Sequence, residues 1–255
     1  MTQTDLLRVA LAQSAIDLNC TPEDLVSGKK IVVESTPHPK ARAYLKLPFA
    51  CNLVSYGGGV VASVSPEVRD TVTNYIEKYP VEHLFETPNL HALDDALAPH
   101  GLRTCFMAEY FLPDLSALKP LPCKYELRLL SPADFKGLYL PQWSNALSDK
   151  RPHLDVLGVG AYDGETLIGF AGCSADCDSM WQIGIDVLPA YRRQGVAAAL
   201  TARLALECLE RGKVPFYCAA WSNIPSVRNA IRAGFRPAWV ELTMKSTETV
   251  NEMNA

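Results

Sequence analysis

The chain has 255 residues, enough to bury a sizeable core in one large domain or two small ones. Hydrophobic residues make up 48% of it and charged residues 20%, as in an ordinary globular protein. The formal net charge of −4 argues against a general nucleic-acid binder, because no basic stripe is present to neutralise phosphates. The chain shows no signal pattern and no apolar run of membrane-spanning length, so we expect a cytoplasmic protein without nucleic-acid or membrane partners.

The N-terminal part of the chain predicts a small α/β arrangement, because apolar residues recur at helical or strand spacing between turn residues. The expected elements are a helix at 6–18, a strand at 30–34, a hairpin at 50–64, a helix at 65–78, a strand at 81–85, a helix at 90–98 and a strand at 103–112. We interpret the triple glycine at 57–59 as the turn of the hairpin rather than a phosphate loop, since no basic or hydroxyl residue directly follows it.

A proline-rich stretch at 113–122 divides the chain. Its three prolines oppose both a helix and a strand ladder, so we predict one domain at 1–115 and a second at 123–250. The first elements expected in the second domain are a strand at 125–130, a helix capped by Ser131, a hairpin at 156–173 that turns at Asp163-Gly164, and a strand at 181–187.

The stretch from Met180 to Glu210 is expected to form a strand, a sharp turn and a helix. Apolar residues alternate up to Val187, Pro189 ends the strand, and apolar residues at helical spacing begin at Val196. A helix N-terminus presents unpaired N–H groups and the positive end of the helix dipole, which suits a phosphate. At this junction the chain reads Arg192, Arg193, Gln194, Gly195, Val196 and Ala197. The two cations and the small residues therefore predict a phosphate-binding helix start.

This junction resembles the acyl-CoA signature of the GNAT superfamily of N-acyltransferases, which reads Gln or Arg, two residues, Gly, one residue, and Gly or Ala. The resemblance continues downstream, where a strand expected at 214–221 precedes Ser222-Asn223 and a helix that closes at Gly234-Phe235. It implies an α/β (α+β) fold with a GNAT-type mixed sheet flanked by helices in the C-terminal half. It also implies that acetyl-CoA is the co-substrate.

The resemblance assigns roles to particular positions of this sequence. The strand before the signature would supply backbone contacts to the pantetheine and the carbonyl, at Ile185 and Val187, and Asn223 would contact the cofactor arm. The signature itself, Arg192 to Ala197, would hold the pyrophosphate. The superfamily's variable substrate-binding helices occur where this chain has Trp143 and Asn145, so we assign these two residues to the acceptor, with a place in the core as the alternative for the tryptophan.

The chain departs from the superfamily pattern in its acid and leaves its base open. Many members carry a tyrosine seven residues after the asparagine as general acid, and that position is Ala230 here. Ser226 is our candidate for the acid, although a serine hydroxyl hydrogen-bonds a thiolate better than it protonates one. Asp186 is the candidate base because it is the nearest carboxylate on the strand, with Asp155 and Glu241 behind it. A solvated or capping role remains the alternative for each carboxylate.

The first half has an element order like that of the second, so we hypothesise that residues 1–115 are a degenerate copy of the same arrangement. Where the signature would follow Val64, the chain reads Ser65-Pro66-Glu67-Val68-Arg69. This stretch has no glycine, and its acidic residue would repel a phosphate. The copy is therefore not expected to bind CoA in the family manner.

The eight cysteines are scattered through predicted strands and helices. Only Cys173 and Cys177 are close in sequence, and a single such pair is weak evidence for zinc. We therefore predict free thiols and no metal site.

The expected function is that of an N-acetyltransferase that moves an acetyl group from acetyl-CoA to a primary amine of a small molecule or peptide. The alternative is a catalytically weak CoA-binding sensor or scaffold protein, which the missing tyrosine and the unplaced base support. We expect a monomer or a homodimer, in which the N-terminal half helps to shape the acceptor site.

Overall fold

The computed structural model describes all 255 residues, and the chain forms two compact units. Unit 1 consists of residues 1–10 and 111–237, and unit 2 consists of residues 11–110 and 238–255. Strands β4 (Leu102–Pro113) and β10 (Phe235–Ser246) and helix α1 (Gln3–Leu18) each contain residues of both units.

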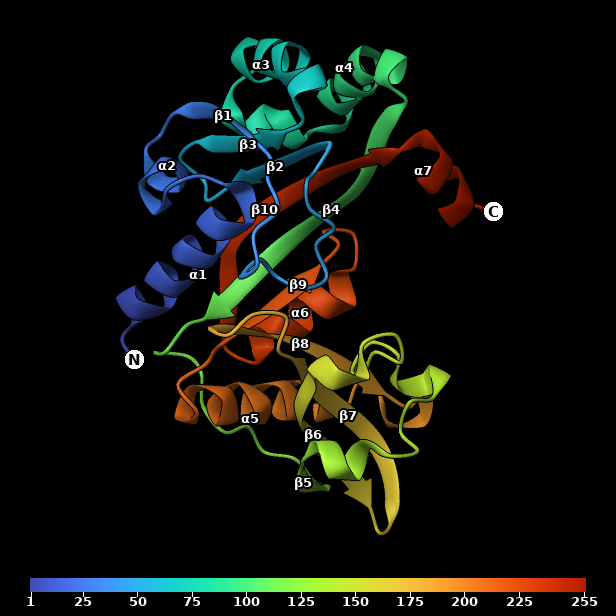
Figure 1. Ribbon diagram of the computed structural model, residues 1–255. Helices are drawn as coiled ribbons and strands as arrows, with labels where there is room; N and C mark the ends of the chain where they lie inside the picture. Colours follow the sequence, from blue (N-terminus) through green and yellow to red (C-terminus); the bar gives the residue numbers. More distant parts are fainter. The chain divides into compact units, whose positions relative to one another are not determined.

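Unit 1 is built on a mixed sheet in the order β9-β8-β7-β6-β5 (Figure 1). Its strands are β5 (Glu126–Leu130), β6 (Asp155–Asp163), β7 (Thr166–Ser174), β8 (Met180–Val187) and β9 (Val214–Ala219). The neighbours from β5 to β8 are antiparallel, whereas β8 and β9 run parallel. Helix α5 (Val196–Glu210) connects the parallel strands and packs against β6, β7 and β8, and α6 (Ile224–Arg232) packs against β9 and α5.

Side chains of β8 alternate between the two faces of this sheet, as strand geometry requires. Ile183 and Ile185 join the apolar core on the α5 side, where they pack with residues such as Leu200 and Leu204. Asp186, on the other face, hydrogen-bonds the segment that follows β5. The predicted strand, turn and helix from Met180 to Glu210 are confirmed, and the turn carries a further short 3-10 helix, η7 (Pro189–Tyr191).

The segment between β5 and β6 covers the face of the sheet opposite α5. It contains only short 3-10 turns, η4 (Pro132–Phe135), η5 (Pro141–Trp143) and η6 (Pro152–Leu154). Ser131 and Asp134 form a capping box, but the helix predicted to start there is a single turn because Gly137, with φ 85°, turns the chain away. Gly172 and Gly184 let this segment approach the strands, since a Cβ at either position would overlap its backbone.

Unit 2 contains a second sheet region in the order β1-β3-β2-β10-β4 (Figure 1). Its remaining elements are β1 (Lys30–Glu34), β2 (Cys51–Ser55), β3 (Val60–Val64), α2 (Pro22–Val26), η1 (Pro66–Val68), α3 (Arg69–Lys78), η2 (Val81–Phe85), α4 (Thr87–Leu97), η3 (Ala98–His100) and α7 (Thr247–Met253). Strand β1 pairs parallel with β3, which is antiparallel to β2, and β2 is antiparallel to β10. Helix α3 packs against β1 and β3 over an apolar core.

Most predicted elements of unit 2 are confirmed, including the hairpin with its glycine turn, in which Gly57 has φ 99°. The strand predicted at 81–85 is wrong, because these residues form the 3-10 helix η2. Only Leu84 of this stretch is buried, and its carbonyl accepts a hydrogen bond from the Tyr75 hydroxyl at 2.7 Å instead of pairing with a strand. Helix α7 was not predicted.

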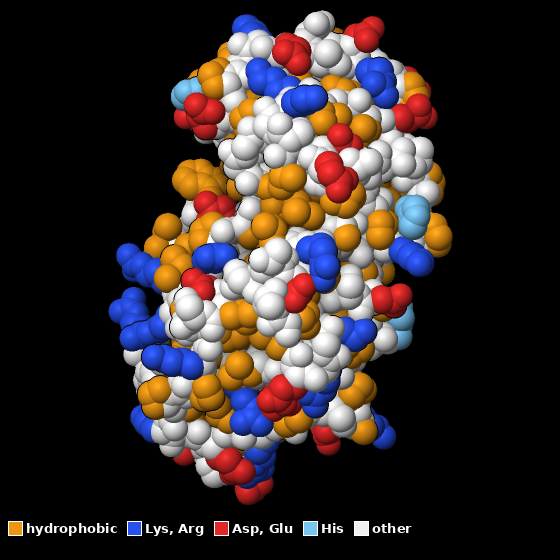
Figure 2. Space-filling model, turned by 90° about the vertical axis from the view of Figure 1, so that its left-hand side faces the viewer, with side chains coloured by type: hydrophobic (Ala, Val, Ile, Leu, Met, Phe, Trp, Pro, Cys, Tyr) orange, Lys and Arg blue, Asp and Glu red, His pale blue; other side chains and the backbone are white.

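Both signs of charge are present on the molecular surface. Figure 2 shows Asp and Glu side chains among the Lys and Arg side chains on the face that it draws, as the small net charge of −4 leads one to expect. None of the helices combines the length and the apolar character that crossing a bilayer would need.

Candidate active site

The edge of β8 that faces β9 is open over most of its length. Parallel pairing ends at Gln182 and Phe216, although β8 continues to Val187 and β9 continues to Ala219. The last five residues of β8 therefore have a partner strand only on the side of β7. Two strands that diverge in this way expose backbone donors and acceptors to which an extended ligand can add.

The backbone N–H groups of Ile185 and Val187 point to this open edge. The N–H of Leu188 donates to the carbonyl oxygen of Ile168 at 2.9 Å, on the β7 side. Because successive N–H groups of a strand alternate in direction, those of Val187 and Ile185 point away from β7. The two positions that the superfamily resemblance assigned to the pantetheine thus carry donors directed toward the gap in the ladder.

A concave array of backbone N–H groups precedes α5. Arg193 and Gly195 have positive φ angles of 61° and 83°, and such an alternation turns consecutive N–H groups to one side. Neither these two residues nor Gln194 donates its N–H to an acceptor in the chain, and the first N–H groups of α5 are unpaired by helix geometry. A Cβ at Gly195 would meet nothing within 4 Å, so the space beside it is open. The array fits an anion such as the pyrophosphate of CoA.

Two polar side chains of the signature, Arg192 and Gln194, make hydrogen bonds within the protein, whereas that of Arg193 points to solvent. The Arg192 Nε donates to the carbonyl of Val187 at 2.9 Å, which ties the turn to the end of β8. The Gln194 amide donates to Ala190 O at 3.1 Å and accepts from the Tyr125 hydroxyl at 3.0 Å. Arg193 is exposed and forms no ion pair, so its guanidinium is available to an anionic ligand.

On the opposite face of the sheet, Asp186 holds the segment that follows β5. Its carboxylate accepts hydrogen bonds from the backbone N–H of Asn145 at 2.9 Å, from the Asn145 side-chain amide at 2.6 Å and from the N–H of Ala146 at 3.1 Å. The structure therefore brings two of the predicted site residues together, but as partners of each other. Asp186 acts here as an anchor for the loop.

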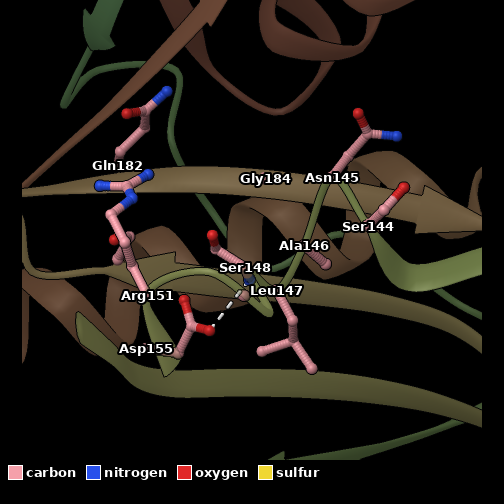
Figure 3. A pocket seen from close by; sticks show the side chains of 11 residues that line it. Ser144, Asn145, Ala146, Leu147, Ser148, Arg151, Asp155, Gln182 and Gly184 are labelled. Atoms are coloured by element: carbon pink, nitrogen blue, oxygen red, sulfur yellow. Dashed lines mark hydrogen bonds between the residues drawn. The ribbon is translucent and has the colours of Figure 1, made fainter. Parts of the chain in front are cut away.

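A pocket lies beside this anchor (Figure 3). It is lined by residues of the loop and of three strands: Ser144, Asn145, Ala146, Leu147, Ser148, Arg151, Asp155, Gly172, Ser174, Gln182 and Gly184. The Arg151 guanidinium forms an ion pair with Asp176, whose side chain is fully buried. The second oxygen of Asp176 and the hydroxyl of Ser174 are buried and accept no hydrogen bond from the protein. Of these two residues, only Ser174 lines the pocket.

Asp155 is a buried carboxylate in the wall of this pocket. It is 3% exposed and accepts the N–H of Ser148 at 3.0 Å, drawn as a dashed line in Figure 3. Burial raises the pKa of the Asp155 carboxyl, and the nearby charge of Asp176 adds to this, whereas the Ser148 hydrogen bond and Arg151 act in the opposite direction. A raised pKa brings a carboxylate closer to what a general base needs near neutral pH.

Two other residues that the sequence pointed to, Trp143 and Glu241, are buried and contact other protein side chains. Trp143 is 3% exposed and packs with Phe135 and Phe170 in the apolar cluster beneath the loop, so it does not line the pocket. Glu241 belongs to unit 2, where it accepts from the Arg42 guanidinium at 2.7 Å and from the Trp239 indole at 2.8 Å. Both its neighbours are buried, and a buried carboxylate paired in this way is a structural element.

Helix α6 begins at the diverging end of β9 and carries the predicted acid. Asn223 is its N-cap residue, and the Asn223 side chain accepts the N–H of Ser226 at 3.3 Å. The Ser226 hydroxyl lies 2.8 Å from the hydroxyl of Tyr217 on β9. Sequence reasoning missed Tyr217, because its position within an apolar strand reads as core, and only the packing of α6 against β9 reveals the contact. Ala230, where a tyrosine was expected from the superfamily, is fully buried.

The cysteines of unit 1 do not converge on a common point. Cys173 lies 3.2 Å from Cys208, and both are fully buried, whereas the Cys177 thiol lies 3.4 Å from the carbonyl of Met180. No disulfide joins any of the eight cysteines, and the chain contains no group of three or more His, Cys, Asp or Glu residues that could hold a metal ion.

An open strand edge that leads to a helix start with unpaired N–H groups suits an extended, phosphate-bearing ligand lying between diverging parallel strands. The chain belongs to the GNAT acetyltransferase family, whose model matches residues 107–238, just over half of the sequence. This confirms the resemblance found in the signature and the predicted α/β fold with a mixed sheet and flanking helices. Members of the family are acyltransferases that use acyl-CoA.

Several solved structures are similar to the chain. A GCN5-related N-acetyltransferase-like protein from Streptococcus suis is 22% identical, with a TM-score of 0.46 over 62% of this chain and 69% of that one. A GCN5-related N-acetyltransferase from Kribbella flavida is 18% identical, with a TM-score of 0.48 over 59% of this chain and 62% of that one, so this chain spans less than two thirds of its length. An acetyltransferase of the GNAT family from Colwellia psychrerythraea is 12% identical, with a TM-score of 0.47 over 96% and 98% of the two chains. No curated protein matches the chain.

Proposed function

We propose that this chain transfers an acetyl group from acetyl-CoA to a primary amine of a small molecule or peptide. The observation that carries the proposal is the end of the parallel ladder at Gln182 and Phe216, because it leaves the donors of Ile185 and Val187 facing a gap that an acyl-pantetheine chain can enter. The N–H array at Gly195 supports it, since it supplies an anion site where the same strand ends. Family membership supports the use of an acyl-CoA.

The chain's own residues can meet the needs of acyl transfer. A thioester oxygen gains negative charge when it is attacked, and the N–H groups at the open edge supply donors for that charge. Asn223 and Ser226, at the start of α6, are our candidates to contact the cofactor arm and the leaving thiolate. A thiol ionises at a pKa of about 8.5, so its thiolate leaves without a strong acid.

The pocket beside the loop is our candidate acceptor site. An amine is protonated at neutral pH, so it brings N–H donors and must lose a proton before it attacks. The wall carboxylate of Asp155 and the neighbouring Ser174 suit such a ligand. We favour Asp155 over Asp186 as the base, because the Asp186 carboxylate is already engaged by three donors of the loop. Asn145 remains a candidate acceptor contact, since it lines the pocket.

The second candidate function is a CoA-binding sensor or scaffold protein without turnover. It is favoured by the burial of Ala230 where a general acid was expected, because the site then lacks a strong proton donor. Both candidates predict CoA binding, and only the first predicts thioester consumption.

The test is an acetyl-CoA assay with a panel of primary amines, in which free thiol is measured with and without each amine. Amine-dependent thiol release supports the transferase. CoA binding by calorimetry without thiol release for any amine would favour the sensor. Failure of CoA to bind at all would overturn both functions.

A further inference from the structure

The hydroxyl groups of Tyr217 and Ser226 form a pair 2.8 Å apart where β9 meets α6. Tyr217 is 3% exposed, whereas Ser226 is half-buried, so the tyrosine lies behind the serine as seen from solvent. Tyr217 is the first residue of β9 beyond the end of the parallel ladder. The pair therefore lies where the open strand edge begins, on the α5 side of the sheet.

The burial of Tyr217 favours donation by its hydroxyl. Burial raises the pKa of the phenol, and the charges of Cys218 and Asp186 add to this, whereas hydrogen bonds with Ser226 and Asn229 act in the opposite direction. The phenol therefore stays protonated at neutral pH, and a buried O–H needs an acceptor.

Asn229 is a second polar neighbour of the Tyr217 phenol. The Asn229 amide donates to Thr201 Oγ1 at 3.0 Å, and Asn229 also lowers the pKa of the Tyr217 phenol. Ser226 Oγ, at 2.8 Å, is the acceptor that lies beside the buried phenol, so we take the phenol to donate its proton to Ser226 Oγ. A hydroxyl that accepts in this way directs its own proton elsewhere, and for the half-buried Ser226 the remaining direction is toward solvent.

We propose that Tyr217 is a positioning residue that orients the Ser226 hydroxyl as a hydrogen-bond donor to the thiolate of CoA. This inference rests on the proposed function, because it takes the CoA sulfur to lie at the start of α6. No proton leaves Tyr217. The Ser226 O–H stabilises the thiolate as the carbon–sulfur bond breaks and the electron pair passes to sulfur, and the thiolate then takes its proton from water.

The decisive variants are Tyr217→Phe, Ser226→Ala and the double variant. Tyr217→Phe keeps the ring and removes only the hydroxyl, so Ser226 keeps its own but loses its orientation. Tyr75→Phe is the matched control, because Tyr75 is also a buried phenol whose hydroxyl makes one 2.7 Å hydrogen bond, to Leu84 O in unit 2. A loss of packing or stability alone would affect both tyrosine variants.

The first readout requires no turnover. Calorimetric Kd values of CoA and of desulfo-CoA are compared between pH 6 and pH 9. In the unchanged protein, CoA should bind more tightly relative to desulfo-CoA as the thiol ionises, because a hydrogen bond to a charged group is the stronger kind. We expect this pH-dependent gain to be lost in Ser226→Ala and to fall by about threefold to tenfold in Tyr217→Phe, and to be unchanged in Tyr75→Phe.

The second readout is kcat with acetyl-CoA and a responsive amine. Tyr217→Phe should lower kcat by about threefold to tenfold with little change in the KM for acetyl-CoA, and should have no further effect once Ser226 is alanine. An unchanged kcat and an unchanged pH-dependent gain in Tyr217→Phe would overturn the inference, as would equal effects with and without Ser226. If the unchanged protein binds no CoA, both the proposed function and this inference are overturned. If the unchanged protein binds CoA and turns over normally, and Tyr217→Phe changes neither kcat nor the pH-dependent gain, only the inference is overturned.

Discussion

Asp186 and Asn145 hold each other, since the carboxylate of Asp186 accepts the side-chain amide of Asn145 at 2.6 Å and its backbone N–H at 2.9 Å. Strand β8 and the loop that lines the pocket are therefore fastened together at one residue. A carboxylate that binds the loop in this way shapes the acceptor side of the site without touching the reacting atoms. The two residues that sequence reasoning assigned to catalysis and to acceptor binding thus share a structural connection.

We expect Asp186→Ala to loosen the loop. Three donors lose their acceptor, and at this partly exposed site we expect the free energy of unfolding to fall by about 1–2 kcal/mol in urea titration. The KM for the amine should rise while the Kd for CoA stays unchanged. Asp149→Ala, which changes an exposed carboxylate of the same segment, is the control and should stay within about 0.5 kcal/mol of the unchanged protein.

The opposite pattern would identify Asp186 as the general base. In that case Asp186→Ala would lower kcat by about 10²-fold or more at unchanged stability and unchanged KM. Such a result would contradict the anchoring role.

The second prediction compares two side chains at Gly195. Its φ of 83° strains any L residue, so Gly195→Asp and Gly195→Asn should lose similar stability in thermal unfolding. Both place a side chain of the same size in the open space beside the N–H array, but only aspartate repels a phosphate. CoA affinity by calorimetry should therefore fall further in Gly195→Asp than in Gly195→Asn, and added salt should narrow the difference. Equal affinities for the two variants would argue against a phosphate at this position.

Structural elements could be predicted from the sequence where neighbouring residues alone determine the conformation. The turn before α5 was predictable because Pro189, the arginines and Gly195 are contiguous and each has a local conformational or electrostatic effect. The strand predicted at 81–85 failed because five residues of mixed character do not show whether a partner strand exists.

The sequence indicated the local geometry of the proposed cofactor side better than that of the proposed acceptor side. Ile185 and Val187 were assigned by resemblance to the superfamily, and the direction of their N–H groups follows from the pairing of β8 with β7. The contacts of Asp186 with Asn145, of Trp143 with Phe170, and of Tyr217 with Ser226 join residues that are distant in sequence. Only tertiary packing determines such pairs, so neither spacing nor composition could identify them.

The third prediction concerns the pH dependence of stability. Burial raises the pKa of Asp155 in the folded protein, so the folded state binds this proton more tightly than the unfolded state does. The stability that this proton contributes is fully present below the unfolded pKa of about 3.9 and is lost as the pH rises through the folded pKa. Asp155→Asn carries no charge and can still accept from Ser148, so it should be more stable than the unchanged protein at pH 7 to 8.

This advantage should disappear as the pH approaches 4, and unfolding in urea across that range measures it. A variant that is less stable at every pH would show that the hydrogen bonds of the carboxylate outweigh its burial. A loss of kcat of about 10²-fold or more with an intact fold would separately support Asp155 as the base.

The last prediction concerns the thiols. Burial raises the pKa of Cys173, and the neighbouring Cys208 raises it further, so the Cys173 thiol stays protonated and unreactive in the folded protein. We expect the thermal midpoint to change little when a reductant or a strong chelator is added, because no disulfide joins the cysteines and no group of three or more His, Cys, Asp or Glu residues could hold a metal. Cys173→Ala tests the packing role, and the smaller side chain should cost about 1–3 kcal/mol through the cavity that it leaves between β7 and α5. Cys177→Ala is the control, since this half-buried thiol lies outside the core cluster and should cost less. A fall of many degrees with chelator, removed by Cys177→Ala, would instead reveal a metal held by these cysteines.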